Sequence, residues 1–529
     1  MSETKRSDER LAKIGQVAVL VGGMAFYAVA VTWLGSRCRA GGPYEWTISA
    51  VVGTLLVCIA AVVGYALWSI WLRGRKESPS PGPAGGGGLL EETGHEVLLR
   101  PLVKTEKRYW ILLLLLGSII GWGAWAYFTQ LGTGLGVTGL RSPYFWGVYL
   151  TNFVFFIGIS HAGTLISAIL RVTHAEWRRP ITRAAEAITV FALCIGAPQV
   201  LIDLGRIDRL TNVIKSGRFQ SPLLWDVCCI TTYLVGSVTY LWLPLIPDLA
   251  MLRDRLPERA RLRRLFYATL AIGWRGTPEQ KHALERAIGF MAVVIIPLAV
   301  SVHTVVSWIF GMTIQPMWHS TILGAYFVIG AIFTGIASLL IAMAILRKVY
   351  HLEKYFKPVH FNNLGLLLLA MTLLWGYATL SEYLTTFYGS EPSHMSVFRA
   401  KFEGTYAPVF WTMVVCCFVI PLPILSIRRL RTITGVVVAS VAVNVGMWLE
   451  RFSIVVPTLS NPRLPYRVEL YHPTWVEWSI TAASFATMFF LYAVFIKVFP
   501  IVSVWEVEEG SLPSGHQSAS LGVVPPQSG

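Results

Sequence analysis

The sequence predicts an all-α, polytopic membrane protein, a helical bundle of about twelve transmembrane helices. Hydrophobic residues make up 54% of its 529 residues and charged residues only 14%, whereas globular proteins are roughly 25% charged. The mean hydropathy is +0.57. A hydrocarbon core about 30 Å thick needs roughly 20 apolar residues per helix, and stretches of that length recur along the chain. These properties exclude a secreted disulfide scaffold, a disordered regulator, a nucleic-acid-binding protein and a cytosolic enzyme.

Twelve apolar stretches are the predicted spans. They lie near 14–34, 47–72, 109–130, 145–170, 184–204, 222–246, 286–307, 321–346, 361–387, 407–427, 433–456 and 477–499. A closed β-barrel is the other structure that can cross a bilayer, but its short segments of alternating polarity do not occur in this sequence.

The distribution of positive charge predicts the orientation of these spans. Loops that alternate along the chain contain 32 lysines and arginines on one side and 11 on the other, and Arg451 lies within a span. Because cytoplasmic loops are enriched in Lys and Arg, both termini are expected in the cytoplasm of a bacterium, with the protein in the inner membrane. The alternation also favours an even number of spans.

Composition divides the chain into four predicted regions. Residues 1–75 form a two-helix membrane appendage, and the Gly- and Pro-rich stretch 76–104 is a cytoplasmic linker. Residues 105–500 hold ten further spans. The Ser-, Gly- and Pro-rich segment 501–529 is expected to be a disordered cytoplasmic tail.

Ionisable residues within spans are costly, and each therefore needs a partner, a water-filled cavity or a function. With the predicted orientation, these residues gather near the outer face, except for His161 near mid-depth. They are His161, Asp203, Arg206, Asp226, His303, His319, Glu382, Glu450 and Arg451.

Several of these residues also have a purely structural interpretation. Asp203 and Arg206, three residues apart on one helical face, are expected to form an ion pair, and Glu450 with Arg451 to form a pair at a helix end. Gly163 and Ser167, small residues at four-residue spacing, predict close packing of their helix.

The histidines and cysteines limit the cofactors that this chain can bind. Only His161 and His303 lie within spans, at unequal predicted depths, so two b-type haems are excluded and one is left open. His303 could instead bond a neighbouring carbonyl, and His319 could lie at the interface. The seven cysteines contain no CxxC or CxxCH, which argues against c-type haem and cysteine-ligated iron–sulfur clusters.

Acids and imidazoles in apolar surroundings suit two kinds of chemistry. Ion or proton transport is one. The other is quinol oxidation, which releases two protons and two electrons and needs a base at each quinol oxygen.

Five sequence motifs resemble one family of membrane subunits. Residues 158–168 (GISHAGTLISA), 221–227 (SPLLWDV) and 301–308 (SVHTVVSW) resemble NrfD/PsrC-like quinone-interacting integral membrane subunits. Residues 318–328 (WHSTILGAYFV) and 444–452 (NVGMWLERF) are most similar to ActC, the quinol-oxidising subunit of alternative complex III. The resemblance covers roughly residues 105–500, in the family's order.

The resemblance implies a ten-helix core with two four-helix bundles, preceded by two extra helices. It implies no cofactor bound by this chain, with quinol (menaquinol or ubiquinol) as substrate and oxidised on the periplasmic side. The implied partners are an iron–sulfur subunit and/or a multihaem cytochrome subunit of a respiratory or photosynthetic complex, a second NrfD-like membrane subunit, and membrane lipids. Proton translocation through the helices is a further implication.

The resemblance also implies roles for individual residues. His161, Asp226 and His303 are the predicted catalytic residues. The predicted neighbours of the quinone are Asp203, Arg206, Glu382 and His319, and the predicted proton path contains Asn444, Glu450 and Arg451. No metal ligands are predicted.

Two departures from the family pattern put the proton path in question. Asp203 stands where the family usually has histidine, and Ile309 stands where ActC-like chains have an acid. Three alternative functions stay open: a quinone-reducing anchor of a periplasmic molybdopterin oxidoreductase, an ion transporter that needs no partner, and a b-type cytochrome.

Overall fold

The computed structural model describes residues 96–511, apart from residues 104, 219, 257–259 and 463–469. The two N-terminal spans predicted at 14–34 and 47–72 lie outside the described residues, as does most of the predicted linker. Within the described residues the secondary structure is helical, and ten helices are long and apolar enough to cross a membrane. These helices coincide with the ten predicted spans from 109 to 499, which confirms the polytopic all-α fold.

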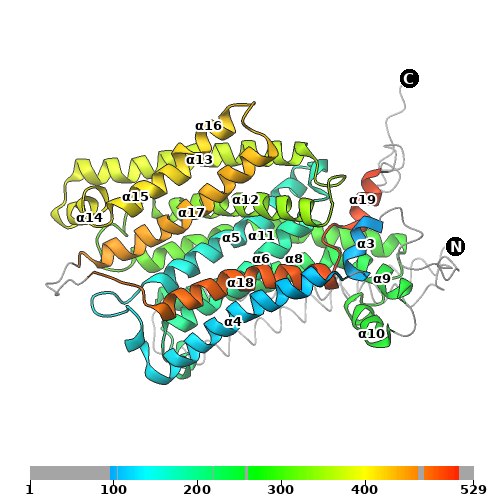
Figure 1. The fold of residues 1–529 in the computed structure, drawn as a ribbon, viewed down its shortest axis with the longest axis horizontal. Coiled ribbons are helices and arrows are strands. Elements are labelled where there is room, and N and C mark those ends of the chain that lie inside the picture. Colours follow the sequence, from blue (N-terminus) through cyan, green and yellow to red (C-terminus); the bar gives the residue numbers. More distant parts are fainter. Residues whose placement is uncertain (1–95, 104, 219, 257–259, 463–469, 512–529) are drawn as a thin grey trace, which may run out of the picture. The chain divides into compact units, whose positions relative to one another are not determined.

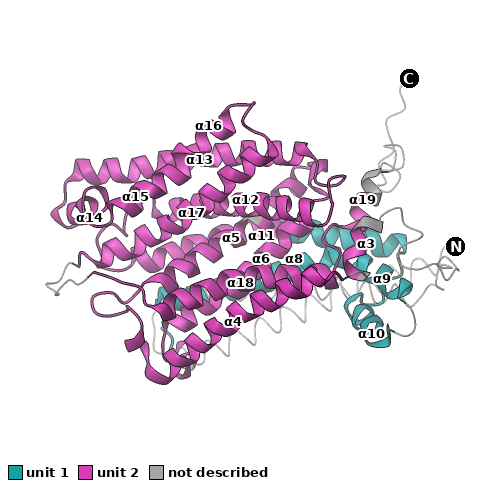
Figure 2. Ribbon diagram, viewed as in Figure 1, with its two compact units in different colours: residues 1–86, 216–291 teal, residues 87–215, 292–529 magenta. Residues whose placement is uncertain are grey.

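The chain divides into two compact units, shown in different colours in Figure 2. The described part of the first unit is 216–291, and the second contains the described residues of 87–215 and 292–529. The helices of the first unit are α8 (Pro222–Trp242), η4 (Leu243–Leu245), α9 (Ile246–Arg255), α10 (Arg261–Leu270) and the beginning of α11 (Pro278–Gly311).

The second unit contains the end of α11 and the other eight described spans. Its helices are α3 (Glu96–Val103), α4 (Lys107–Thr133), η1 (Leu135–Val137), α5 (Val148–Val172), η2 (Glu176–Arg178), α6 (Thr182–Asp203), η3 (Ile207–Arg209), α7 (Thr211–Lys215), α12 (Leu323–Val349), α13 (Pro358–Gly389), α14 (Pro392–Phe402), α15 (Ala407–Val414), the π-helix η6 (Val415–Val419), α16 (Pro421–Ser426), α17 (Ile433–Leu459), α18 (Trp475–Val498) and α19 (Val504–Ser511).

The spans of the second unit pack in two groups (Figure 1). Helices α4, α5, α6 and α18 form one group, and α12, α13, the α15–α16 segment and α17 form the other. Helix α5 joins the groups because it also packs against α12 and α17. It is buried along most of its length, whereas the apolar side chains of α4 are largely exposed, as expected for a helix that faces lipid.

Small residues on α5 allow its close packing against α6. A Cβ atom at Gly163 would lie 1.6 Å from the carbonyl oxygen of Ala185, so only glycine fits there. The Ser167 hydroxyl donates to Glu186 at 2.7 Å across the same contact. The predicted close approach of this helix is therefore confirmed.

The segment after residue 500 is ordered further than its composition predicted. Residues 504–511 form α19, and Glu506 is buried against the connection between α5 and α6. Its carboxylate lies 2.5 Å from Arg171 Nη2. Arg183 donates to the Pro500 carbonyl at 3.0 Å and to the Ser503 hydroxyl at 3.1 Å. The prediction of disorder is thus wrong for 501–511, because this basic connection pairs with an acid and with carbonyls there.

Candidate functional site

His161 and His303 are in direct contact inside the second unit. Their ring centroids lie 3.8 Å apart with the planes at 67°, and both side chains are fully buried. His161 comes from the middle of α5 and His303 from the last part of α11. The prediction that they lie at unequal depths is therefore wrong: the two helices cross so that positions at different distances from their ends meet.

The two imidazoles differ in their hydrogen bonding. His161 Nδ1 lies 3.1 Å from the Ile157 carbonyl oxygen, and Nε2 lies 2.5 Å from that of Ala299. Because a neutral imidazole carries one N–H, both contacts are hydrogen bonds only when the ring holds a second proton. A neutral His161 therefore donates to only one of these two carbonyls.

His303 lacks such partners. Neither of its ring nitrogens has a hydrogen-bond partner among the described residues, although the side chain is completely buried. Buried polar groups are normally hydrogen-bonded, and one left unpaired costs roughly 1–3 kcal/mol. A group absent from this chain, such as a ligand oxygen or a water molecule, would satisfy the His303 nitrogens. The alternative that His303 bonds a neighbouring carbonyl is therefore not observed.

A buried ion pair lies close to the two histidines. Glu450 and Arg451 of α17 are 3.1 Å apart (Oε2 to Nη1) and are almost completely buried. Arg451 is near enough to interact electrostatically with both imidazoles. The predicted pair is therefore present, but it lies inside the bundle and well before the end of α17.

Two residues of α12, Phe327 and Gly330, pack against the Arg451 side chain. A Cβ atom at Gly330 would lie 2.5 Å from Arg451 Nη2, so a larger residue there would force the guanidinium to shift. The guanidinium also lies 5.0 Å from the centroid of the Phe327 ring, within the range of a cation–π interaction. Despite these contacts, both terminal nitrogens of Arg451 and both carboxylate oxygens of Glu450 lack hydrogen-bond partners of good geometry among the described residues.

A second polar cluster occupies the end of α13. Glu382 Oε2 accepts a hydrogen bond from the Ser320 hydroxyl at 2.6 Å. Lys401 of α14 donates to the Tyr383 hydroxyl at 3.3 Å and interacts electrostatically with Glu382 and Glu450. The hydroxyl oxygen of Tyr326, on α12, lies 3.2 Å from Oγ1 of Thr379, which is on α13.

Lys401 was not among the residues predicted from the sequence, where it falls in an outer loop. Only 4% of Lys401 is exposed, and Val397, four residues earlier, is fully buried. That i, i+4 spacing is the signal that would have placed Lys401 on the inward face of a short helix.

Burial of Lys401 predicts a pH dependence of stability. Burial lowers the pKa of its ammonium group to about 8, whereas an unfolded chain keeps a lysine proton up to about pH 10.4. Between these values the unfolded state binds more protons, so the unfolding free energy should rise with pH, by on the order of 1–3 kcal/mol between pH 8 and 10. Denaturant unfolding at several pH values checks this.

The lysine variant Lys401→Met should lack this rise, while Lys348→Met, at an exposed lysine, should keep it. An identical pH dependence in the wild type and Lys401→Met would contradict the prediction.

Asp203 and Arg206 do not pair with each other. Arg206 makes two hydrogen bonds to Asp208, at 2.8 and 2.7 Å, and both side chains are exposed. The predicted ion pair is wrong because α6 ends at Asp203 and the chain turns there, with Gly205 at φ +68°. A left-handed φ of this kind suits glycine.

Asp203 lies instead near a buried acid of α18. It interacts electrostatically with Glu477 and Tyr149. Glu477 accepts hydrogen bonds from the Tyr471 hydroxyl and from the backbone N–H groups of Gly139 and Thr474, at 2.7 and 2.8 Å for the backbone groups. Glu477 was not predicted from the sequence, although its place three residues after Thr474 forms a capping box. These bonds give Glu477 a structural role.

Three predicted residues are still to be placed: Asn444, His319 and Asp226. Asn444 accepts from the Ser338 hydroxyl at 2.8 Å and so links α17 to α12. His319 is exposed, with its Nε2 3.2 Å from that of His394. Asp226 of α8 belongs to the first unit. It is 5% exposed, and its Oδ1 has no hydrogen-bond partner among the described residues.

Comparison with known families connects this arrangement to one group of proteins. The family model described as "Polysulphide reductase, NrfD" matches residues 136–461. The chain belongs to the NrfD family. The match contains His161, Asp226, His303, Glu382, Glu450 and Arg451, so the NrfD part of the chain carries both polar clusters.

Three curated relatives of this NrfD-family chain have names that describe subunits of redox complexes. A dimethyl sulfoxide reductase membrane subunit of Halobacterium salinarum is 32% identical over 239 residues, or 45% of this chain and 51% of that protein. The chain thus spans about half the length of that relative. A selenate reductase subunit of Mesobacillus selenatarsenatis is 23% identical, over 75% of this chain and 94% of that protein.

The third relative is the Hdr-like menaquinol oxidoreductase integral membrane subunit of Archaeoglobus fulgidus, at 21% identity. The similarity extends over 76% of this chain and 96% of that protein. The NrfD-family chain is therefore similar over most of its length to two subunits of redox enzymes.

Proposed function

We propose that this chain is the quinol-binding membrane subunit of an oxidoreductase complex and that it oxidises quinol and passes the electrons to a partner subunit. The observation that carries the proposal is His303, a fully buried imidazole with two unpaired nitrogens, in contact with a second imidazole. A quinol hydroxyl would supply the missing hydrogen bond, and the apolar surroundings suit its ring.

The two histidines divide the proton chemistry in this proposal. Oxidation of quinol to quinone releases two protons and two electrons. His303 accepts the hydrogen bond of the reacting hydroxyl and takes its proton as a general base. His161, whose ring contacts that of His303, is the next group that takes this proton in the proposal. Asp226 stays a predicted catalytic residue.

The second polar cluster provides a route for protons in this proposal. Glu450, Tyr326, Lys401 and Glu382 are electrostatic neighbours between the ion pair and the end of α13. In the proposal, these acids and the lysine pass protons along this series. Proton translocation is therefore part of the proposal, with Glu382 at the outlet.

The names of the relatives favour a reductase complex as the assembly. In the proposal the electrons leave for an iron–sulfur or multihaem subunit on the periplasmic side, since we propose that this chain binds no redox cofactor of its own. A quinone-reducing anchor of a molybdopterin oxidoreductase, using the same site in the opposite direction, is the second candidate, favoured by the dimethyl sulfoxide and selenate reductase relatives. The ActC-like assignment stays a prediction.

The decisive experiment is purification of the intact complex through a tag on this chain in mild detergent. A partner with iron–sulfur, haem or molybdenum centres should co-purify, and adding menaquinol or ubiquinol should reduce those centres as followed by absorbance. The isolated chain should oxidise no quinol. Ion uptake into liposomes by the isolated chain, without any partner, would overturn the proposal in favour of a transporter.

A further inference from the structure

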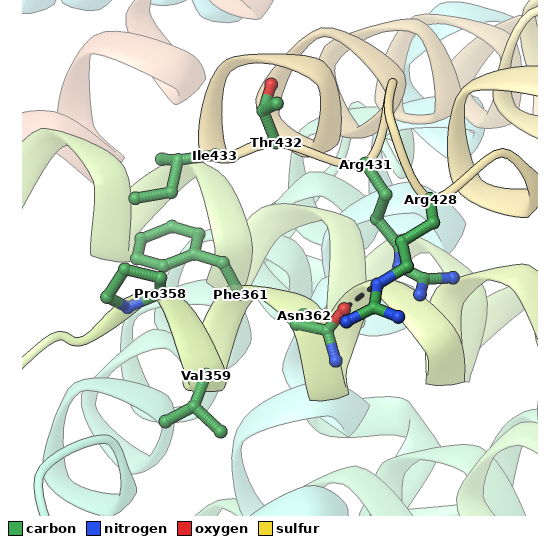
Figure 3. Close-up of a pocket in the computed structure, with 8 residues that line it drawn as sticks. All are labelled: Pro358, Val359, Phe361, Asn362, Arg428, Arg431, Thr432 and Ile433. Carbon is green, nitrogen blue, oxygen red and sulfur yellow. Dashed lines mark hydrogen bonds between the residues drawn. The ribbon is translucent and has the colours of Figure 1, made fainter.

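A hollow of about 510 Å³ lies at the other end of the second helix group from the α13–α14 turn. It is formed where α13 and α17 begin and the segment after α16 ends (Figure 3). The residues that line it are Pro358, Val359, Phe361, Asn362, Arg428, Arg431, Thr432 and Ile433. It is separate from the histidine site, and the proposed function does not use it.

The hollow carries positive charge that its own lining does not neutralise. Arg428 and Arg431 are two of its eight residues, and none of the eight is acidic. Figure 3 shows both arginine side chains reaching down toward Asn362. Like charges that share a cavity favour an anion between them, because the anion offsets their repulsion.

One of the two arginines is held in place before any ligand arrives. Arg431 Nε donates to Asn362 Oδ1 at 3.0 Å, and its Nη1 donates to the Leu425 carbonyl at 2.9 Å. Its Nη2 makes no hydrogen bond to the described residues, so it is available to a ligand. A guanidinium fixed in this way loses little conformational entropy on binding an anion, and its planar fork matches a phosphate.

The rest of the hollow is apolar and lies at a helix end. Phe361 is buried beneath it, and Val359 is 48% exposed at its rim. Ile427 and Leu430, in the turn that carries the arginines, are 49% and 47% exposed. Since three spans end here, the hollow lies at the depth of the lipid headgroups, where exposed apolar side chains meet acyl chains.

We propose that this hollow binds the phosphate of an anionic membrane phospholipid, with Arg428 and Arg431 on the headgroup and the apolar rim against its acyl chains. The combination of two arginines, a polar amide and an apolar rim at a span end fits a phosphodiester attached to a hydrocarbon tail. A soluble phosphate would use the arginines alone.

Native mass spectrometry of the full chain released from nanodiscs tests the proposal. The nanodiscs contain equal amounts of phosphatidylglycerol and phosphatidylcholine. The wild type should retain phosphatidylglycerol preferentially, and Arg428→Gln should lower that retention roughly fivefold. The double variant Arg428→Gln/Arg431→Gln should lose the preference.

Arg429 provides the matched control, because it is exposed in the same turn and does not line the hollow. Arg429→Gln should retain phosphatidylglycerol as the wild type does. An equal loss in Arg429→Gln and Arg428→Gln would overturn the site, because the effect would then be general surface charge. Displacement of the lipid by 10 mM inorganic phosphate would assign the hollow to a soluble anion instead. Arg428→Gln retains Arg431 and its two bonds, so its result does not depend on whether the double variant folds.

Discussion

Replacing His303 by alanine is expected to slow quinol-dependent reduction of the partner subunit by about 100-fold or more, the usual contribution of a general base. The reason is that His303 is buried with both ring nitrogens unpaired and so is available to a quinol oxygen. Stopped-flow absorbance of the partner's redox centres in the purified complex measures the rate. Co-purification of the partner shows that the variant still assembles.

His360→Ala is the control for loss of a buried imidazole. His360 is 5% exposed at the start of α13, where its Nδ1 accepts from the backbone N–H of Lys357 at 2.9 Å. This variant should lose some stability but keep the electron-transfer rate. The same assay applied to His161→Ala and Asp226→Asn tests the other two proposed catalytic residues. A wild-type rate in His303→Ala would remove this histidine from the mechanism.

Replacing Arg451 by methionine should lower the unfolding free energy by about 3–5 kcal/mol, the typical cost of breaking a buried ion pair. Arg451 and Glu450 are about 1–2% exposed and 3.1 Å apart, so the substitution leaves the Glu450 carboxylate buried without its counter-charge. Denaturant unfolding in detergent, followed by tryptophan fluorescence, measures the loss.

The double variant Glu450→Gln/Arg451→Met tests the cause of that loss. It should recover most of the stability, because no uncompensated charge stays buried. If the double variant loses as much unfolding free energy as Glu450→Gln and Arg451→Met lose in sum, the two residues are not coupled and the explanation fails. Asp208→Asn breaks the exposed pair with Arg206 and should leave the stability unchanged, because water screens exposed ion pairs.

The spans could be predicted from the sequence because a bilayer imposes their length and polarity on the chain itself. Each apolar stretch near 20 residues from 109 to 499 corresponds to an observed helix. The sequence also predicted the close packing of α5 at Gly163, because small residues at four-residue spacing lie on one face of a helix. Family membership followed from motifs that occur in order along the chain.

Contacts between helices far apart in the sequence were decided only by the tertiary structure. The sequence placed His161 and His303 in separate spans, but their contact depends on how α5 and α11 cross, which no local pattern encodes. Arg206 pairs with Asp208 rather than Asp203 because the chain turns where α6 ends. Lys401 is internal because α14 folds back against α13, and a charge in a loop is otherwise expected to face water.

The amino-acid sequence by itself thus determined the membrane class, the span positions and the family, since these depend on hydropathy and motifs along one chain. The tertiary structure decided which polar side chains meet and which buried nitrogens lack a partner. The physical reason is that a hydrogen bond or an ion pair depends on distances of a few ångströms between helices, and these distances follow from side-chain packing across the whole bundle.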